Sequence, residues 1–187
     1  MEVNKAIRTR RSVRKYKDEK LPEQTIRELI ELAVWAPSAV NNQPWAFVVL
    51  EDREYLKNLS GRAKTFVLER LDKLPHLEKY RSMLGNPDLD IFHGAPALVL
   101  IYSPKTLDTY VNDCSMAALN LMLAAWDRGI GSSWIGFARG IGNTPGVKKE
   151  LGVPEEYQLV APVILGYPEG STASVDRKPP QILSWRK

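Results

Sequence analysis

Ala95-Pro96-Ala97-Leu98-Val99-Leu100-Ile101-Tyr102 is a continuous apolar run bounded by Gly94 and Pro104. An uninterrupted apolar run of this length with a β-branched centre predicts a strand in the middle of a sheet. Residues 108–128 follow it and predict a long helix that is apolar nearly all round, since only Asn120 is polar between Met116 and Trp126. A helix without a solvated face lies at the centre of its fold or between subunits.

Working outward, the segments 46–50, 132–137 and 157–165 predict further strands, with 46–50 buried and 157–165 apolar. Helices are predicted at 3–9, from Pro22 to the turn before Pro37, and from Asn143-Thr144-Pro145 to 149. Few strands among many helices indicate an α+β layer structure rather than a doubly wound sheet. The glycines at 129, 131 and 136 follow a helix, so they do not form a dinucleotide-binding fingerprint.

Two further segments complete the expected domain, which spans residues 1–187 without a linker. Residues 52–94 are charged and helix-prone, with interruptions predicted at Gly61 and Pro75. This insert is either a mobile cover over a site or ordinary helical decoration. Residues 166–187 form a C-terminal tail with little core-forming content, which is typical of a segment that lies on a partner subunit.

The composition excludes several classes of protein. The single cysteine, Cys114, rules out an intrachain disulfide, and His76 and His93 have no nearby cysteine, so no metal site is predicted. The charged N-terminus is not followed by an apolar run, and no apolar stretch is long enough to span a bilayer. We therefore expect a cytoplasmic protein with no membrane partner.

Positive charge is concentrated around Arg10-Arg11-Ser12-Val13-Arg14. The first twenty residues carry eight Lys/Arg and three Asp/Glu, whereas the whole chain has a net charge of only +4. A local cluster of this kind suits a compact anion such as phosphate. Two alternatives are the solvated face of a short amphipathic helix and binding of nucleic acid, although nucleic acid usually needs a broader basic face.

A polar, turn-rich segment runs from Pro37 through Ser38, Ala39, Asn41 and Gln43 to Trp45. It is either a plain connection from helix to strand or a rigid loop that hydrogen-bonds a heteroaromatic ring.

Four segments, in this order, resemble the nitroreductase family of FMN-dependent oxidoreductases. They are residues 10–14, 36–45, 118–136, and 165–168 with the following 177–179. The resemblance implies a nitroreductase-like fold, with a central, mostly antiparallel sheet of about four to five strands flanked by helices. It also implies a homodimer with domain-swapped tails and FMN sites at the subunit interface.

The resemblance also implies cofactor contacts. The phosphate and ribityl oxygens would be held by Arg10, Arg11, Ser12, Arg14 and Arg177. The ring would be walled by loop residues of the other subunit, namely Pro37, Ser38, Ala39, Asn41 and Gln43. Ile135 and Gly136 would lie beside the reactive centre, where a backbone N–H can hydrogen-bond the ring. The family positions that touch the carbonyl edge of the ring correspond here to Asp88 and Ile91, which leaves that edge without an assigned partner. His93 is expected to cap or pack.

The implied activity is transfer of electrons from NADH or NADPH to nitroaromatic, quinone or similar electron-poor acceptors by a ping-pong mechanism. The redox chemistry would belong to FMN, so no catalytic side chain is predicted. Two alternatives on the same fold are a flavin-fragmenting or dehalogenating enzyme and a flavin-binding, electron-carrying module.

Overall fold

The computed structural model describes residues 2–105 and 108–187. At its centre lies a sheet with the spatial order β1-β2-β4-β3. The strands are β1 (Ala46–Leu50), β2 (Ala97–Pro104), β3 (Gly131–Trp134) and β4 (Tyr157–Gly166). Each neighbouring pair is antiparallel, with Val99 of β2 opposite both Val49 and Val163. The predicted antiparallel α+β sheet is confirmed, and the apolar run that begins at Ala95 supplies its central strand.

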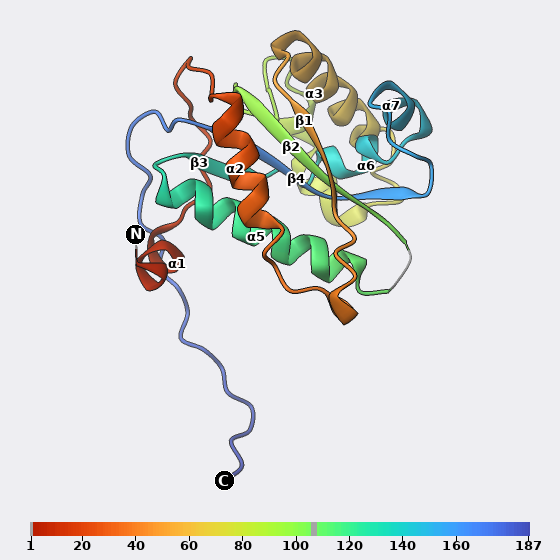
Figure 1. Cartoon of the computed structure of the whole chain (residues 1–187). Helices are drawn as coiled ribbons and strands as arrows, with labels where there is room; N and C mark the ends of the chain where they lie inside the picture. The colour runs from red at the N-terminus through yellow and green to blue at the C-terminus, as the bar shows by residue number, and fades with distance from the viewer. Residues whose placement is uncertain (1, 106–107) are drawn as a thin grey trace.

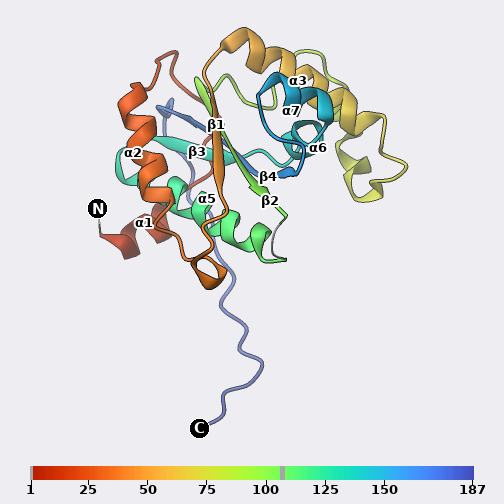
Figure 2. The same ribbon diagram turned by 45° about the vertical axis from the view of Figure 1, so that its right-hand side comes forward.

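Helices cover both faces of the sheet (Figures 1 and 2). One face carries α1 (Val3–Thr9), α2 (Glu23–Ala33) and α5 (Tyr110–Asp127), and the other carries α3 (Arg53–Leu68), η2 (Pro75–Tyr80), α4 (Arg81–Gly85), α6 (Ala138–Gly142) and α7 (Pro145–Glu150). Alternation along β2 supplies both cores: Leu98 and Leu100 pack with α3, whereas Val99 packs with α2 and α5. The sheet is therefore buried on both sides.

Local signals explain where the helices start. Asp52 caps α3, because its carboxylate accepts hydrogen bonds from the N–H groups of Glu54 (2.9 Å) and Tyr55 (3.0 Å). Thr144 caps α7 by accepting from the N–H of Val147 at 3.4 Å. The interruption predicted at Gly61 is wrong, since α3 runs through it. A glycine costs a helix only about 1 kcal/mol, which the burial of the flanking apolar residues outweighs.

The insert is anchored by one buried lysine. Lys64 on α3 is only 9% exposed, and its ammonium donates to the carbonyl oxygens of Asn86 and Leu89, both at 2.8 Å. These bonds fix the loop after α4 against α3. The insert thus packs on the sheet through its own part of the core.

Two strand predictions need correction. The strand at 46–50 was expected to be buried, but β1 is half-buried because it lies at the edge of the sheet. The strand predicted at 132–137 ends at Trp134. The chain turns there because the N–H of Ile135 donates to the carbonyl of Pro162 at 2.8 Å and α6 begins three residues later.

The tail leaves the body of the chain after a short tether. The N–H of Glu169 donates to the carbonyl of Lys15 at 3.0 Å, and no helix or strand is assigned from there to Lys187. Figures 1 and 2 show the last residues running away from the rest of the chain. Leu183 and Trp185 are 89% and 74% exposed. Among the helices of the described residues, none has both the length and the apolarity to cross a membrane.

Candidate functional site

The basic segment is held in place by the valine at its centre. Val13 is 2% exposed, and its N–H donates to the carbonyl of Ser132 on β3 at 3.0 Å. Ser12 forms a parallel bridge with the same residue. Because side chains alternate along an extended segment, burial of Val13 turns Ser12 and Arg14 away from the core.

The arginines meet the tail in one cavity of about 410 Å³. Its lining consists of Arg10, Arg11, Ser12, Arg14, Thr172, Ala173, Val175 and Arg177. The structure thus brings the N-terminal cluster and Arg177 together, although 163 residues separate Arg14 from Arg177 in the sequence. We refer to this space as the anion cavity.

No acidic side chain among the described residues forms an ion pair with the arginines of the anion cavity. Arg10 Nη1 and Arg11 Nε are buried and have no hydrogen-bond partner within the described part of the chain. Burial, followed by the charges of Arg177 and Arg11, lowers the pKa of Arg10. A buried guanidinium N–H without an acceptor is costly, and an oxyanion would supply that acceptor. The donors present therefore fit a phosphate group.

A second cavity, of about 300 Å³, adjoins the first. Its lining consists of Arg14, Tyr80, Met83, Leu89, Ile91, His93, Trp134, Ile135, Gly136 and Phe137. Arg14 lines both cavities, so it stands at their junction. The second cavity is largely apolar with a few polar groups, as expected for a space that takes a flat ring. We refer to it as the ring cavity.

The backbone just before α6 offers a free donor to the ring cavity. The N–H of Ile135 is already donated to Pro162 at 2.8 Å. The N–H of Gly136 makes no hydrogen bond to any residue that the structure describes. Of the two residues predicted from the sequence to lie beside the reactive centre, Gly136 is therefore the one whose backbone can donate to a ligand.

His93 is a residue of this site that sequence reasoning missed. It has a φ of +57° and precedes Gly94 at +68°, a region that residues other than glycine seldom adopt. The carboxylate of Asp90 fixes this turn by accepting from the N–H groups of Phe92 (2.9 Å) and Gly94 (2.8 Å). Burial, with the charge of Arg14 second, lowers the pKa of His93, while Asp90 opposes the shift.

Asp88 and Ile91, the two positions considered for the carbonyl edge of the ring, lie in different places relative to the ring cavity. Ile91 lines the ring cavity, but its side chain has no hydrogen-bonding group. Asp88 does not line it. Arg14 and His93 both line this cavity, and the charge of Arg14 acts on the imidazole of His93. A histidine directly before a glycine and three residues after an aspartate was the one sequence signal that could have indicated this position.

The predicted ring loop lies elsewhere in the chain. The N–H of Ala39 donates to the carboxylate of Asp113 near the start of α5 (3.2 Å), whereas the indole of Trp126 near its end donates to Thr9 (2.9 Å). Thirteen helical residues separate Asp113 from Trp126, about 20 Å along the axis. Figure 1 shows the loop and α1 at opposite ends of α5. Within one chain, the loop and the arginines cannot contact the same ring.

The loop is nevertheless ordered by its own contacts. The N–H of Gln43 donates to Ser38 Oγ at 2.9 Å, and its side-chain amide donates to Asn41 Oδ1 at 3.1 Å. Asn41 and Gln43 have φ values of +55° and +47°. Pro37, Ser38 and Ala39 belong to this loop as predicted, but the structure does not bring it to either cavity.

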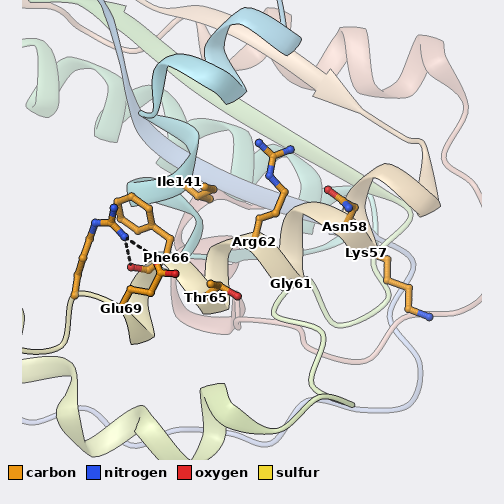
Figure 3. A pocket seen from close by; sticks show the side chains of 9 residues that line it. Lys57, Asn58, Gly61, Arg62, Thr65, Phe66, Glu69 and Ile141 are labelled. Carbon is orange, nitrogen blue, oxygen red and sulfur yellow. Dashed lines mark hydrogen bonds and ion pairs between the residues drawn. The ribbon is translucent and has the colours of Figure 1, made fainter.

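Another hollow, of about 540 Å³, lies on the outer face of α3 (Figure 3). Its two arginines are paired with acids, Arg62 with Glu150 at 2.7 Å and Arg70 with Glu69 at 3.3 Å, and Lys57 is the remaining cation of its lining. None of the residues predicted for the site lines it. It therefore lacks the group of unpaired arginines that marks the anion cavity.

An anion cavity that opens into a ring-sized cavity defines a protein suited to a flat cofactor with a terminal phosphate. A family model described as "Nitroreductase family" matches residues 7–167. A protein of Archaeoglobus fulgidus with the provisional name NADH dehydrogenase/NAD(P)H nitroreductase is 37% identical over 172 residues, which cover 90% of this chain and 86% of the relative. The chain therefore belongs to the nitroreductase family and is an oxidoreductase of that family.

Two further relatives bear on the site. A nitroreductase of Bacteroides fragilis, whose crystal structure contains bound FMN, superposes with a TM-score of 0.87 at 26% identity, and the match covers 100% of both chains. The iodotyrosine deiodinase of Thermotoga neapolitana is 31% identical over 170 residues, covering 86% of this chain and 85% of that protein.

Proposed function

We propose that this protein is a homodimeric FMN-dependent oxidoreductase that takes electrons from NADH or NADPH and passes them to nitroaromatic, quinone or similar electron-poor acceptors. The observation that carries this proposal is the junction of an arginine-lined cavity with a ring-sized cavity at Arg14. When bound, FMN would supply the redox chemistry, accepting hydride from the nicotinamide and reducing the acceptor in a second half-reaction.

The residues divide the task of binding. Arg10 and Arg177, with Arg11 and Ser12, would hold the phosphate, because the unpaired N–H groups of this cavity point to an oxyanion. Arg14 at the junction would hold the ribityl chain and the adjacent part of the ring. A cation at that position stabilises negative charge that builds up on the ring.

The ring cavity would position the flat part of the cofactor. Gly136 would donate its free N–H to the ring, and the apolar side chains of Ile91 and Phe137 would exclude water from it. The sequence analysis assigned no partner to the carbonyl edge of the ring. We propose that His93, beside Arg14, hydrogen-bonds this edge. Its lowered pKa keeps the imidazole neutral near pH 7, so one ring nitrogen donates and the other accepts.

A second copy of the chain would complete the site. Loop 37–43 and α1, which leads into the arginine segment, contact opposite ends of α5, so the loop would wall a ring held by these arginines only across a dimer interface. Exposed apolar side chains surround α5, including Leu119 (51% exposed), Trp35 (82%) and Ile7 (59%). The exposed tail residues Ile182, Leu183 and Trp185 would lie on the partner in the same assembly. An apolar surface of this kind is typical of an obligate interface.

The first experiment is an absorbance spectrum of the purified protein, followed by anaerobic addition of NADH and then NADPH. A flavin spectrum that bleaches rapidly, and returns on addition of a quinone, supports the proposal and identifies the electron donor. A flavin spectrum that resists both nucleotides supports the electron-carrying module instead. Absence of flavin before and after titration with FMN would refute the proposal.

Dehalogenation is a second candidate, supported by the identity with the Thermotoga neapolitana deiodinase. Release of iodide from a halogenated phenol, measured with the chemically reduced protein, distinguishes it from reduction of a nitroaromatic.

A further inference from the structure

A third cavity, of about 610 Å³, lies between the insert and the segment around α6. Its volume is about twice that of the ring cavity. Six large side chains form its walls: Phe66, Val67, Leu74, Leu77, Tyr80 and Phe137. We refer to it as the side chamber. Phe66, labelled in Figure 3, also lines the outer hollow on α3, so its ring separates the side chamber from that surface.

The side chamber adjoins the ring cavity. Tyr80, Gly136 and Phe137 line both spaces. The rings of Tyr80 and Phe137 meet edge to face, with centroids 5.3 Å apart and planes at 79°, and form the partition. Tyr80 Oη makes no hydrogen bond within the described residues, so this ring can turn without breaking one. Beside the partition, a Cβ added to Gly136 would meet nothing within 4 Å.

The interior of the side chamber offers little to a polar ligand. Asn143 is its one amide side chain, and both the nitrogen and the oxygen of that amide are already hydrogen-bonded to backbone groups. Its nitrogen donates to the carbonyls of Arg139 (3.0 Å) and Leu159 (3.1 Å), while its oxygen accepts from the N–H of Leu159 (2.7 Å). Of the other polar side chains in the lining, His76 and Arg139 are exposed, and Tyr80 belongs to the partition.

We propose that the side chamber binds the apolar arm of an electron acceptor whose electron-poor ring stacks on the exposed face of the cofactor ring in the ring cavity. The acceptor class is a quinone that carries a hydrocarbon side chain. A small nitrobenzene or an unsubstituted quinone would leave the side chamber unused, whereas an alkyl arm would pass the Tyr80–Phe137 partition and bury its methylenes. This inference rests on the proposed function, since it assigns the acceptor of the same site.

The electron donor of the proposed function, NAD(P)H, supplies the electrons that this reaction needs. The quinone takes up two electrons and two protons, a hydride equivalent from NAD(P)H and a proton from solvent, and becomes a hydroquinone while NAD(P)H becomes NAD(P)⁺. The adenosine half of the nicotinamide cofactor is a poorer occupant, because its diphosphate and ribose groups would meet mostly apolar walls, with Arg139, His76 and the Tyr80 hydroxyl as the polar side-chain groups besides Asn143.

The test compares 2-methyl-1,4-benzoquinone with a 1,4-benzoquinone that carries a straight ten-carbon chain, both below the concentration at which the latter aggregates. We expect the kcat/KM of the wild-type protein for the long-chain quinone to be higher by about tenfold or more. Leu77→Trp fills the side chamber and should remove this preference while leaving the short quinone within about twofold of wild type. Leu74→Trp fills the same space from a different position and should do the same.

Leu68→Trp is the matched control, because Leu68 packs on the same core without lining the side chamber. It should retain the preference for the long chain. Equal use of both quinones by a wild-type protein that NAD(P)H reduces normally would overturn the inference and leave the proposed function standing. If Leu77→Trp slowed the reduction of the protein by NAD(P)H as much as it slowed turnover of the long-chain quinone, the side chamber would be assigned to the nicotinamide cofactor. That result would also overturn the inference. Failure of NAD(P)H to reduce the wild-type protein would instead contradict the proposed function.

Discussion

Replacing Arg10 by glutamine tests two effects of the anion cavity separately: its effect on the stability of the FMN-free protein and its contribution to FMN affinity. In the chain alone, Arg10 is a partly buried cation beside Arg11 and Arg177, with one buried N–H left without an acceptor. Removing its charge relieves this repulsion, so the melting temperature of the FMN-free variant should equal or exceed that of the wild type. A charge-assisted hydrogen bond to a phosphate contributes about 1.5–3 kcal/mol, so the Kd for FMN should rise by about 10- to 150-fold.

The assay is titration of the FMN-free protein with FMN, followed by quenching of flavin fluorescence. Riboflavin, which has the same ring and ribityl chain without the phosphate, is the control ligand, and its affinity should change by less than about twofold. Arg8→Gln is the control variant, because Arg8 carries the same charge on α1, is exposed and does not line the cavity. Equal losses for FMN and riboflavin, or equal effects of the two variants on FMN, would refute the assignment of the phosphate to this cavity.

Three further predictions concern the frame of the site. Gly131→Ala places a Cβ 2.8 Å from the side chain of Val13; it should lower the free energy of unfolding by roughly 1–3 kcal/mol and weaken FMN binding, as measured by urea denaturation and FMN titration. Leu119→Arg places a charge on the exposed apolar face of α5 and should yield a monomer that has lost FMN, as seen by sedimentation velocity; a stable dimer would contradict the proposed interface. Burial lowers the pKa of His93 below its ordinary value of 6.5, so the unfolded state binds the extra proton first and stability falls as the pH drops below about 6.5. His93→Gln should lose part of this dependence in melting curves between about pH 7.5 and 5.

Much of the fold could be predicted because the apolar pattern is strong. Continuous apolar runs located the strands that become β2 and β4, and Pro22 and Pro37 bounded the helix that becomes α2. The break predicted at Gly61 failed because propensity is a local quantity, whereas the burial of α3 against the sheet is tertiary.

The site was predictable in part. The resemblance assigns Arg10, Arg14 and Arg177 to one cofactor site, and these residues line one cavity; their contact with FMN stays a prediction. It could not show that Pro162 already uses the N–H of Ile135, because that bond depends on where β3 ends against β4. It also could not place His93, whose direction is set by a left-handed turn that the carboxylate of Asp90 holds.

The position of α5 has a consequence for how sequences of this kind can change. In the proposed dimer this helix acts as a spacer, since one end carries the arginine segment and the other carries the loop that reaches the partner's ring. Inserting a single residue would lengthen the helix by about 1.5 Å and rotate everything beyond it by about 100°. Because both copies have the same sequence, the loop would be displaced from the partner's ring at both sites of the dimer. Point substitutions on the surface of α5 should therefore be tolerated far more readily than any insertion or deletion within it.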